Sequence, residues 1–164
     1  MKAIILAAND NTQLRPLNLR KPSALIKING IPLLEHQIQG YSRAGVEMAS
    51  ISVVSGYQYS QVKRYVLREH PDIRLVKNPD YRSTSALYSL DLALRRAEPG
   101  TTDEGVFISS GTCVYEDETI ERVSRVSGSA IVVDSGHYEA ASTKVIADVT
   151  PIRVTEAQRS SEPA

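Results

Sequence analysis

The chain has 164 residues, 41% of them hydrophobic, and its 19 basic and 19 acidic side chains give a formal net charge of zero. This length suits one domain that buries about 70% of its unfolded surface. The zero net charge excludes a general nucleic-acid binder. The lack of an apolar run of ~20 residues excludes a membrane-spanning helix. A single cysteine, Cys113, excludes a disulfide framework, and with no signal-peptide pattern after Met1 it favours a cytoplasmic protein.

The first part of the chain predicts a strand, a polar loop and a helix. Lys2–Ala8 is a continuous apolar run with β-branched residues, which is typical of a strand buried on both faces of a parallel sheet. An arginine-bearing loop follows over Asn9–Lys21. Asn29-Gly30 then predicts a turn, after which Pro32 opens an amphipathic helix that Gly45 ends.

The same alternation of strands and helices continues to the end of the apolar sequence. The patterns predict a strand at Ile51–Val54, a helix at Gln58–Glu69, a strand at Ile73–Val76, a helix at Thr84–Ala97, a strand at Gly105–Ser109, a helix at Glu116–Val126, a strand at Ala130–Asp134, and a β pair at Thr143–Val149 and Ile152–Val154.

This alternation predicts an α/β fold with three layers, a mostly parallel sheet and right-handed crossovers. Ligands on such sheets bind beyond the carboxyl ends of the strands. The segment Glu156–Ala164 is small and polar, and we expect it to be a disordered tail or an interdomain linker. Residues 1–155 are therefore expected to form one domain.

Residues 6–34, LAANDNTQLRPLNLRKPSALIKINGIPLL, resemble the signature of the nucleoside-triphosphate transferase family, which includes sugar-nucleotide and choline-phosphate cytidylyltransferases. The family pattern is L-A-A-G-x-G-x-R-L-x-P-L-T, followed by P-K-x-L and G-x-P-L-L. The positions in register with it are Leu6, Ala7, Ala8, Leu14, Pro16, Leu17, Pro22, Leu25, Gly30, Pro32, Leu33 and Leu34.

Four further segments resemble the family in the same order, and together the matches reach Val149. Val53–Tyr57 resembles the family's V-V-x-G-Y, and Ser110–Thr112 resembles S-G-D. Asn78–Tyr81, with Thr84 and Ser89-Leu90, resembles the N-x-x-Y…T-N-N…S-L stretch of the choline-phosphate branch. Ala130–Asp134, with Lys144-Val145, resembles V-V-D…K-V. The resemblance implies a three-layer, Rossmann-like (GT-A-like) nucleotidyltransferase fold.

The departures from the family pattern fall on positions that carry chemistry. The replacements are Asn9 and Asn11 for two loop glycines, Gln13 for arginine, Asn18 for threonine, Ser23 for lysine and Thr112 for the metal-binding aspartate. Asparagine tolerates positive φ best after glycine, so we expect Asn9 and Asn11 to keep the shape of the loop. Arg15, Arg20 and Lys21 lie close to the vacated positions and are expected to supply the missing cations.

The resemblance implies transfer of CMP from CTP to a phosphate- or phosphonate-bearing small molecule, with Mg²⁺ and release of pyrophosphate. Catalysis would fall to Arg15, Arg20 and Lys21, and the metal to Asp134, with Glu116 and Asp117 behind it. The implied nucleotide contacts are Leu6, Ala7, Ala8, Asn9, Asn11, Gly56, Tyr57, Asn78, Thr84, Ser85, Ser110, Gly111 and Thr112. The charge pattern agrees, because Met1–Gly30 is mainly basic whereas Glu98–Glu121 holds seven acidic residues and no basic one.

Simpler structural roles stay open for the same residues. The three cations could belong to a solvated loop, Asp134 could end its strand, and the acids from Glu116 to Glu118 complement a helix dipole. The other candidates have equally simple alternatives: a strand-end turn for Gly56 and Tyr57, a turn before Pro79 for Asn78, and a helix cap for Thr84.

Two functional alternatives also stay open. One is a catalytically degenerate nucleotide-binding, regulatory or dimerisation module, which the missing aspartate and lysine favour. The other, a dinucleotide-binding enzyme, is disfavoured because the sequence lacks G-x-G-x-x-G and no acidic residue follows the second strand at Ser55. Since homologous transferases are longer and the tail resembles a linker, we expect a homo-oligomer or part of a fusion protein, comparable to the short cytidylyltransferase domain fused to phosphoenolpyruvate mutase in phosphonate pathways.

Overall fold

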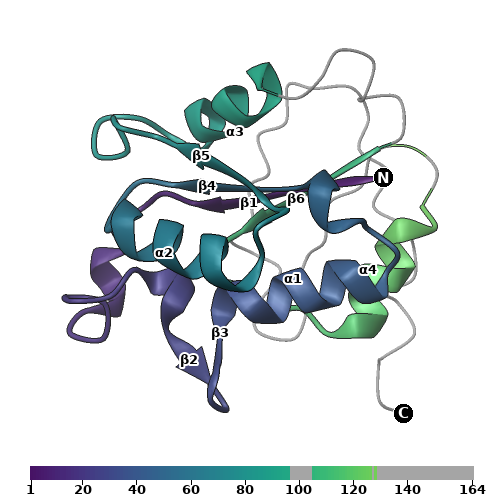
Figure 1. Ribbon diagram of the computed structural model, residues 1–164, viewed down its shortest axis with the longest axis horizontal. Helices are drawn as coiled ribbons and strands as arrows, with labels where there is room; N and C mark the ends of the chain where they lie inside the picture. The colour runs from purple at the N-terminus through teal and green to yellow at the C-terminus, as the bar shows by residue number, and fades with distance from the viewer. Residues whose placement is uncertain (97–104, 127, 129–164) are drawn as a thin grey trace, which may run out of the picture. The chain divides into compact units, whose positions relative to one another are not determined.

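The computed structural model describes residues 1–96, 105–126 and 128 (Figure 1). It divides the chain into two units, Met1–Asp117 and Glu118–Ala164, and each is described by itself. The strands predicted after residue 128 and the predicted tail lie outside the described residues, so the assignment of residues 1–155 to one domain stays a prediction.

A four-stranded parallel sheet forms the centre of the first unit. Its strands are β1 (Lys2–Ala7), β4 (Ile51–Ser55), β5 (Arg74–Lys77) and β6 (Val106–Ser110), arranged in the order β5-β4-β1-β6. Ala7 is in register with Ser55, and Leu6 with Ser110. The carboxyl ends of the strands therefore meet at one edge, and the predicted parallel α/β sheet is confirmed.

Helices cover both faces of this sheet (Figure 1). The helices α1 (Leu33–Arg43) and α2 (Tyr59–Glu69) lie on one face, and α3 (Ala86–Arg95) lies on the other. Right-handed crossovers explain this division, because the chain advances from β1 to β5 in one direction and then returns past β1 to β6. The three-layer, Rossmann-like architecture is thus confirmed, and the reversal of strand order between β1 and β6 is its topological switch point.

The core consists of aliphatic side chains packed against the two faces of the sheet. On the α3 side, Ile4, Val54 and Val76 of the sheet pack with Ala93. The fully buried residues of α1 and α2 include Leu34, Ile38, Val62 and Val66. Because each fully buried aliphatic side chain contributes about 1.5–3 kcal/mol, this packing fixes the helices and the loops that leave the sheet.

A short β-hairpin precedes α1. Its strands β2 (Lys27–Ile28) and β3 (Ile31–Pro32) pair antiparallel. They are joined by the predicted Asn29-Gly30 turn, whose residues have φ values of 51° and 82°. The predicted start of the helix at Pro32 is correct to within one residue: Pro32 is its N-cap, is extended and pairs with Lys27, and the helix begins at Leu33.

Short 3-10 helices and one further helix complete the described chain. The 3-10 helices are η1 (Thr12–Leu14), η2 (Ser23–Leu25) and η3 (Met48–Ser50), and the helix is α4 (Asp117–Ser124). The predicted boundaries of α3 and α4 are wrong by one or two residues at each end. Within the described residues, the helices are too short or too polar to span a membrane.

Candidate functional site

The candidate site lies at the topological switch point, where the segments after β1, β4 and β6 meet. The Leu6 carbonyl accepts a hydrogen bond of 2.8 Å from the Gly111 amide, and the Ala8 carbonyl accepts one of 2.8 Å from the Tyr57 amide. The sheet thus brings together the predicted residues at the end of β1 and those that follow the two neighbouring strands. Open α/β sheets bind ligands in this position.

Two glycines allow this close approach. A Cβ atom on Gly111 would lie 2.6 Å from the Ala7 Cβ atom, and one on Gly56 would lie 2.5 Å from the Tyr81 Cβ atom. Both distances are shorter than carbon atoms can approach without displacement of the backbone. Gly56 and Gly111 therefore shape the candidate site by leaving room for their neighbours.

The loop after β1, residues 9–21, adopts a conformation that the sequence predicts only in part. Asn11 has a φ of 42°, as expected for a residue in place of glycine, and its Nδ2 atom donates to the Ser23 hydroxyl at 2.7 Å. Asn9 is not among the described residues with positive φ. The expectation that both asparagines replace glycine in its special conformation is therefore confirmed for Asn11 and wrong for Asn9.

Side chains of the first turn of α2 and the residues before it hold this loop, which we call the anchored loop. The Tyr57 hydroxyl donates to the carbonyls of Asn18 and Leu19 at 3.2 and 3.0 Å, and the Gln61 side chain donates to the Arg20 carbonyl at 2.9 Å. Within the loop, the buried Asn18 side chain donates to the carbonyls of Asp10 and Asn11. Sequence analysis did not find the roles of Asn18 and Gln61.

The three cations predicted on the anchored loop differ in their surroundings. The Arg15 guanidinium lies 3.9 Å from the Asp10 carboxylate, so part of its charge is neutralised within the loop. Arg20 and Lys21 are exposed, and no ion pair joins either to another described residue. Because Tyr57 and Gln61 hold only the backbone here, the charged ends of Arg20 and Lys21 stay available to a ligand.

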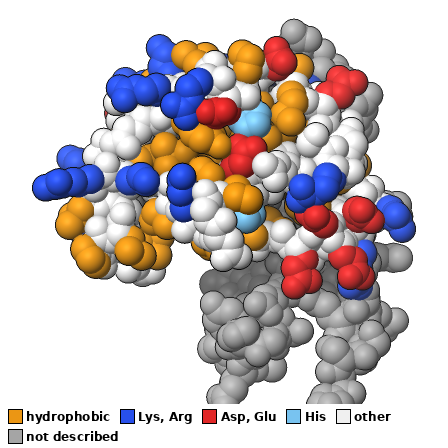
Figure 2. Space-filling model, turned by 60° about the horizontal axis from the view of Figure 1, so that its bottom comes forward, with side chains coloured by type: hydrophobic (Ala, Val, Ile, Leu, Met, Phe, Trp, Pro, Cys, Tyr) orange, Lys and Arg blue, Asp and Glu red, His pale blue; other side chains and the backbone are white. Residues whose placement is uncertain are grey.

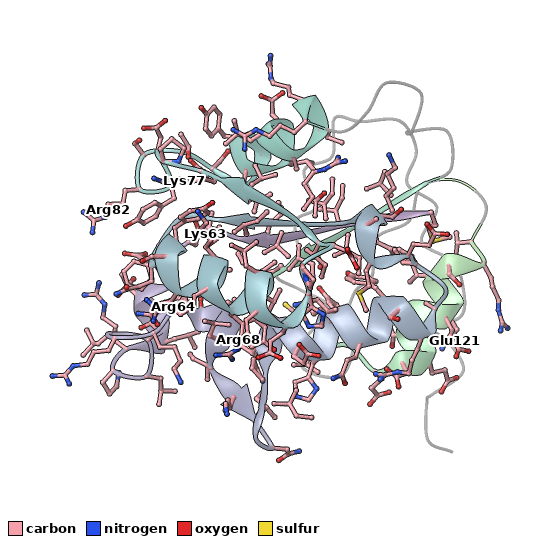
Figure 3. The ribbon with its side chains drawn as sticks, in the orientation of Figure 1. Lys63, Arg64, Arg68, Lys77, Arg82 and Glu121 are labelled. Atoms are coloured by element: carbon pink, nitrogen blue, oxygen red, sulfur yellow. The ribbon has the colours of Figure 1, made fainter. Side chains whose placement is uncertain are left out.

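Further cations, which the sequence analysis did not single out, lie toward the same edge of the sheet. Figure 3 shows Lys63 and Arg64 of α2 on the same side of the molecule as Lys77 and Arg82. The Lys77 ammonium lies 5.3 Å from the ring centre of Tyr59. Figure 2 shows Lys and Arg side chains gathered at this end of the α1–α2 face, which is therefore a basic end of the molecule.

The segment after β6 forms a neutral turn over residues 110–113, which we call the β6 turn. The hydroxyls of Ser110 and Thr112 lie 2.9 Å apart, and the Cys113 amide donates to the Ser110 carbonyl at 3.2 Å. The buried Gln37 side chain of α1 donates hydrogen bonds to two carbonyls of this turn. Sequence analysis missed Gln37, although a polar residue on the apolar stripe formed by Leu34, Ile38 and Tyr41 was a signal that could have found it.

Asn78 and Thr84 support the loop between β5 and α3. The buried Asn78 Nδ2 atom donates to the hydroxyls of Thr84 and Ser89 at 3.1 and 3.0 Å, and its Oδ1 atom accepts from the Asp80 amide at 2.9 Å. Thr84 in turn donates to the Asp80 carbonyl at 2.8 Å. Since α3 begins after Ser85, which makes no side-chain cap bond, the alternative of Thr84 as a helix cap is wrong.

The described part of the site holds no cluster of metal-ligating side chains. Among residues 1–96, 105–126 and 128, no three His, Cys, Asp or Glu side chains come together in a way that could hold one. Asp117 pairs with Arg43 at 2.6 Å, and Glu116 is exposed. Asp134, the predicted ligand, lies outside the described residues and stays a prediction.

A polar cluster joins α1 to α2 behind the site. The Glu35 carboxylate accepts a hydrogen bond of 2.6 Å from the Tyr65 hydroxyl, lies 2.7 Å from the His70 Nε2 atom, and accepts one of 2.9 Å from Gln39. Burial alone would raise the pKa of Glu35, but the contacts with Tyr65, His70 and Gln39 hold that pKa below its ordinary value. Burial and the neighbouring carboxylate raise the pKa of the Tyr65 hydroxyl.

Comparisons with known proteins give the chain its family and relatives. The family model described as "MobA-like NTP transferase domain" matches residues 3–155. The chain is 37% identical over 118 residues to a 2-aminoethylphosphonate cytidylyltransferase of Lancefieldella rimae, an alignment that covers 72% of this chain and 45% of the relative. It is 40% identical over 92 residues to a choline-phosphate cytidylyltransferase of Streptococcus pneumoniae, covering 56% of this chain and 38% of that one.

A solved structure of the CTP:phosphocholine cytidylyltransferase from Streptococcus pneumoniae is also similar to this chain. The TM-score is 0.57 at 33% identity, over 67% of this chain and 44% of that one. The chain thus spans less than half the length of these relatives.

Proposed function

The chain belongs to the MobA-like NTP transferase domain family, and on that premise we propose that it transfers CMP from CTP to a small molecule bearing a phosphate or phosphonate group. An oxygen of that group forms a bond to the α-phosphorus of CTP. The bond from this phosphorus to the oxygen that bridges it to the β-phosphate breaks, and pyrophosphate leaves with the electron pair. Such transfers depend on positioning and on neutralising the phosphate charges.

One observation carries the proposal: Tyr57 and Gln61 hold the backbone of the anchored loop, and Arg20 and Lys21 on this loop are exposed and form no ion pair with another described residue. A triphosphate needs cations that are not already paired, and charge-assisted hydrogen bonds are the strong ones. The resemblance of residues 78–90 to the choline-phosphate branch and the names of the relatives support cytidine as the base. The alignments cover less than half of each of these relatives, so the acceptor is part of the proposal.

We include Mg²⁺ in the proposal because metal ions commonly neutralise the phosphates in such transfers. No cluster of three metal-ligating side chains is present among the described residues. Asp134 is the residue to test as a ligand. In the described site, this chain's own residues bind the phosphates through Arg20 and Lys21 and orient the nucleotide through the ends of β1 and β6.

A thermal-shift panel of the four ribonucleoside triphosphates, with and without Mg²⁺, tests the proposal. At 100 times its Kd, a ligand stabilises the folded state by about 2.7 kcal/mol, which corresponds to a rise in Tm of about 5–10 °C for a chain of this size. We expect the largest rise with CTP. Release of pyrophosphate on addition of phosphocholine or 2-aminoethylphosphonate should follow. If no triphosphate raises the Tm, the proposed function is wrong.

A second candidate, nucleotide binding without transfer, is favoured by one contact. Asn11 and Ser23 stand where the family pattern has glycine and lysine, and their neutral side chains hydrogen-bond to each other at 2.7 Å. At the sequence position of the family's lysine, the chain thus carries an uncharged side chain that is already bonded to Asn11. A chain that binds CTP but releases no pyrophosphate with any phosphate or phosphonate acceptor would support this candidate over the transferase.

A further inference from the structure

The side chain of Gln37 is a buried amide with all of its hydrogen-bonding groups in use. Gln37 is 1% exposed and lies on the apolar stripe of α1. Its Nε2 atom donates to the carbonyls of Ser110 and Cys113 at 2.7 and 2.6 Å, and its Oε1 atom accepts from the Ser109 hydroxyl at 2.7 Å. An amide buried without partners costs several kcal/mol, so these three bonds account for its presence among apolar residues.

These bonds hold the β6 turn at both of its ends. The two carbonyls that accept from Gln37 belong to Ser110, the first residue of the turn, and Cys113, its last residue. From the other side, the Gly111 amide donates to the Leu6 carbonyl at 2.8 Å, and its backbone lies against Ala7. The turn is therefore held between β1 and α1, and its position relative to the end of β1 is fixed.

The turn leaves its own hydroxyl groups available at the switch point. Ser110 is exposed, Thr112 is half-buried, and their hydroxyls lie 2.9 Å apart. Neither hydroxyl contacts Gln37, which binds only the carbonyls of the turn and the Ser109 hydroxyl. The bond between the two hydroxyls uses one of their protons, so one O–H group of the pair can donate to a ligand. Holding the backbone fixes this group before the ligand arrives, which lowers the ordering cost of binding.

Only an amide of this length satisfies the pocket. Two carbonyl oxygens point at one end of the side chain and a hydroxyl group at the other, so the residue must supply two N–H donors and one acceptor. A glutamate would place a carboxylate against two carbonyl oxygens. A methionine of similar size would remove the donor to both carbonyls and the acceptor that Gln37 offers to the Ser109 hydroxyl.

We propose that Gln37 is a positioning residue for nucleotide binding, which sets the Ser110 and Thr112 hydroxyls toward the nucleotide by fixing the β6 turn. This inference rests on the proposed function. It assigns no chemistry to Gln37 itself, which acts through the turn. It predicts that nucleotide affinity depends on the donor capacity of the side chain at position 37.

The inference is tested by isothermal titration calorimetry, which measures the Kd for CTP of the full chain carrying Gln37→Met. Loss of these bonds weakens CTP binding about tenfold, the size expected for one or two net hydrogen bonds. Gln39→Met is the matched control, because Gln39 lies on the same helix and its side chain bonds only to Glu35. It should bind CTP within about twofold of the unsubstituted chain. Circular dichroism establishes that each variant is folded.

Gln37→Glu supplies a readout that a purely structural role would not change. At low pH the protonated carboxyl donates one hydrogen bond to a turn carbonyl, whereas the carboxylate at high pH donates none. The ratio of its CTP Kd to that of the unsubstituted chain should therefore fall as the pH is lowered from 8 to 5.5. Ser109→Ala removes the bond to Oε1 and the contact of the Ser109 hydroxyl with Tyr41. It should weaken CTP binding about twofold and covers the case in which Gln37→Met does not fold.

The outcomes separate the inference from the function on which it rests. If the unsubstituted chain binds no nucleotide, the proposed function is wrong and this inference fails with it. If it binds CTP, and folded Gln37→Met binds equally well or the Kd ratio of Gln37→Glu does not change with pH, the inference alone is overturned.

Discussion

The anchored loop and the β6 turn flank the end of β1, and they differ in charge but are held in the same way. Tyr57 and Gln61 donate to carbonyls of the loop, and Gln37 donates to carbonyls of the turn. The loop carries exposed cations, whereas the turn carries hydroxyls. In both regions, side chains on a helix or just before one donate to backbone carbonyls of the segment and leave its own side chains available to a ligand.

This difference in charge assigns different tasks to the two regions. Cations attract phosphates over distance and in a salt-dependent way, so the anchored loop should determine most of the nucleotide affinity. Neutral hydroxyls act only at hydrogen-bond distance, so the β6 turn should determine orientation. Variants that remove charge from the loop should therefore have larger effects than variants that alter the turn or the supports behind it.

Removal of the loop cations should have the largest effect. In a chain with both Arg20→Ala and Lys21→Ala, we expect CTP to bind roughly 30-fold more weakly, because two charge-assisted contacts of about 1 kcal/mol each are lost. The residual affinity should depend less on salt. Titrations at two salt concentrations measure both effects. Lys27→Ala, an exposed cation in the hairpin strand β2, is the control; unchanged affinity in the double variant would refute the role of these cations.

Loss of the loop anchor should have a smaller effect. Tyr57→Phe keeps the ring but removes the hydroxyl that donates to the carbonyls of Asn18 and Leu19. We expect about fivefold weaker CTP binding and faster proteolysis within residues 9–21, because one net hydrogen bond is worth about 1 kcal/mol. Tyr59→Phe, at the first residue of α2, is the control and should change neither the CTP affinity nor the rate of proteolysis. Equal behaviour of the two variants would show that the loop does not depend on the anchor.

A substitution in the Glu35 cluster should have the smallest effect on CTP binding. The bonds of Glu35 run between α1, Tyr65 of α2 and His70, and none of them reaches the anchored loop or the β6 turn. Glu35→Gln should lower the free energy of unfolding by about 1 kcal/mol at pH 7, with little change in CTP affinity. The folded-state pKa of Glu35 lies below its unfolded value. The stability that it contributes is therefore present above the unfolded pKa and is lost as the pH falls through the folded one.

Urea unfolding at several pH values measures this contribution. The difference in unfolding free energy between the two chains should shrink below about pH 4, where the carboxyl of the unsubstituted chain becomes protonated. A difference that stays constant from pH 7 to pH 3 would contradict this assignment. A large loss of CTP affinity in Glu35→Gln would show that nucleotide binding depends on this cluster.

The sheet could be predicted from the sequence because its signals are local. The apolar runs that became β1 and β4 are long and uninterrupted, and Asn29-Gly30 is a strong turn signal. The β2–β3 hairpin was not predicted, since its strands have two residues each and show no alternation.

The supports of the site could not be predicted from the sequence because their partners are distant. The bonds from Gln37 to the β6 turn and from Tyr57 to the anchored loop join residues 73 and 38 positions or more apart. Likewise, the sequence shows Arg15 as one of three similar cations, whereas the fold places it beside Asp10. Only tertiary structure decides which loop carbonyls need a donor and which charges are already paired.

The most direct test of the account is an amide chemical-shift titration of the full chain with CTP. We predict the largest shifts in the amides of residues 9–21 and 110–113, in the anchored loop and the β6 turn, with the hairpin amides of Lys27–Ile28 and Ile31 unchanged. Shifts confined to one of the two regions would contradict the claim that both the anchored loop and the β6 turn contact the nucleotide. Shifts located elsewhere, or none, would contradict the claim that the nucleotide binds at the switch point.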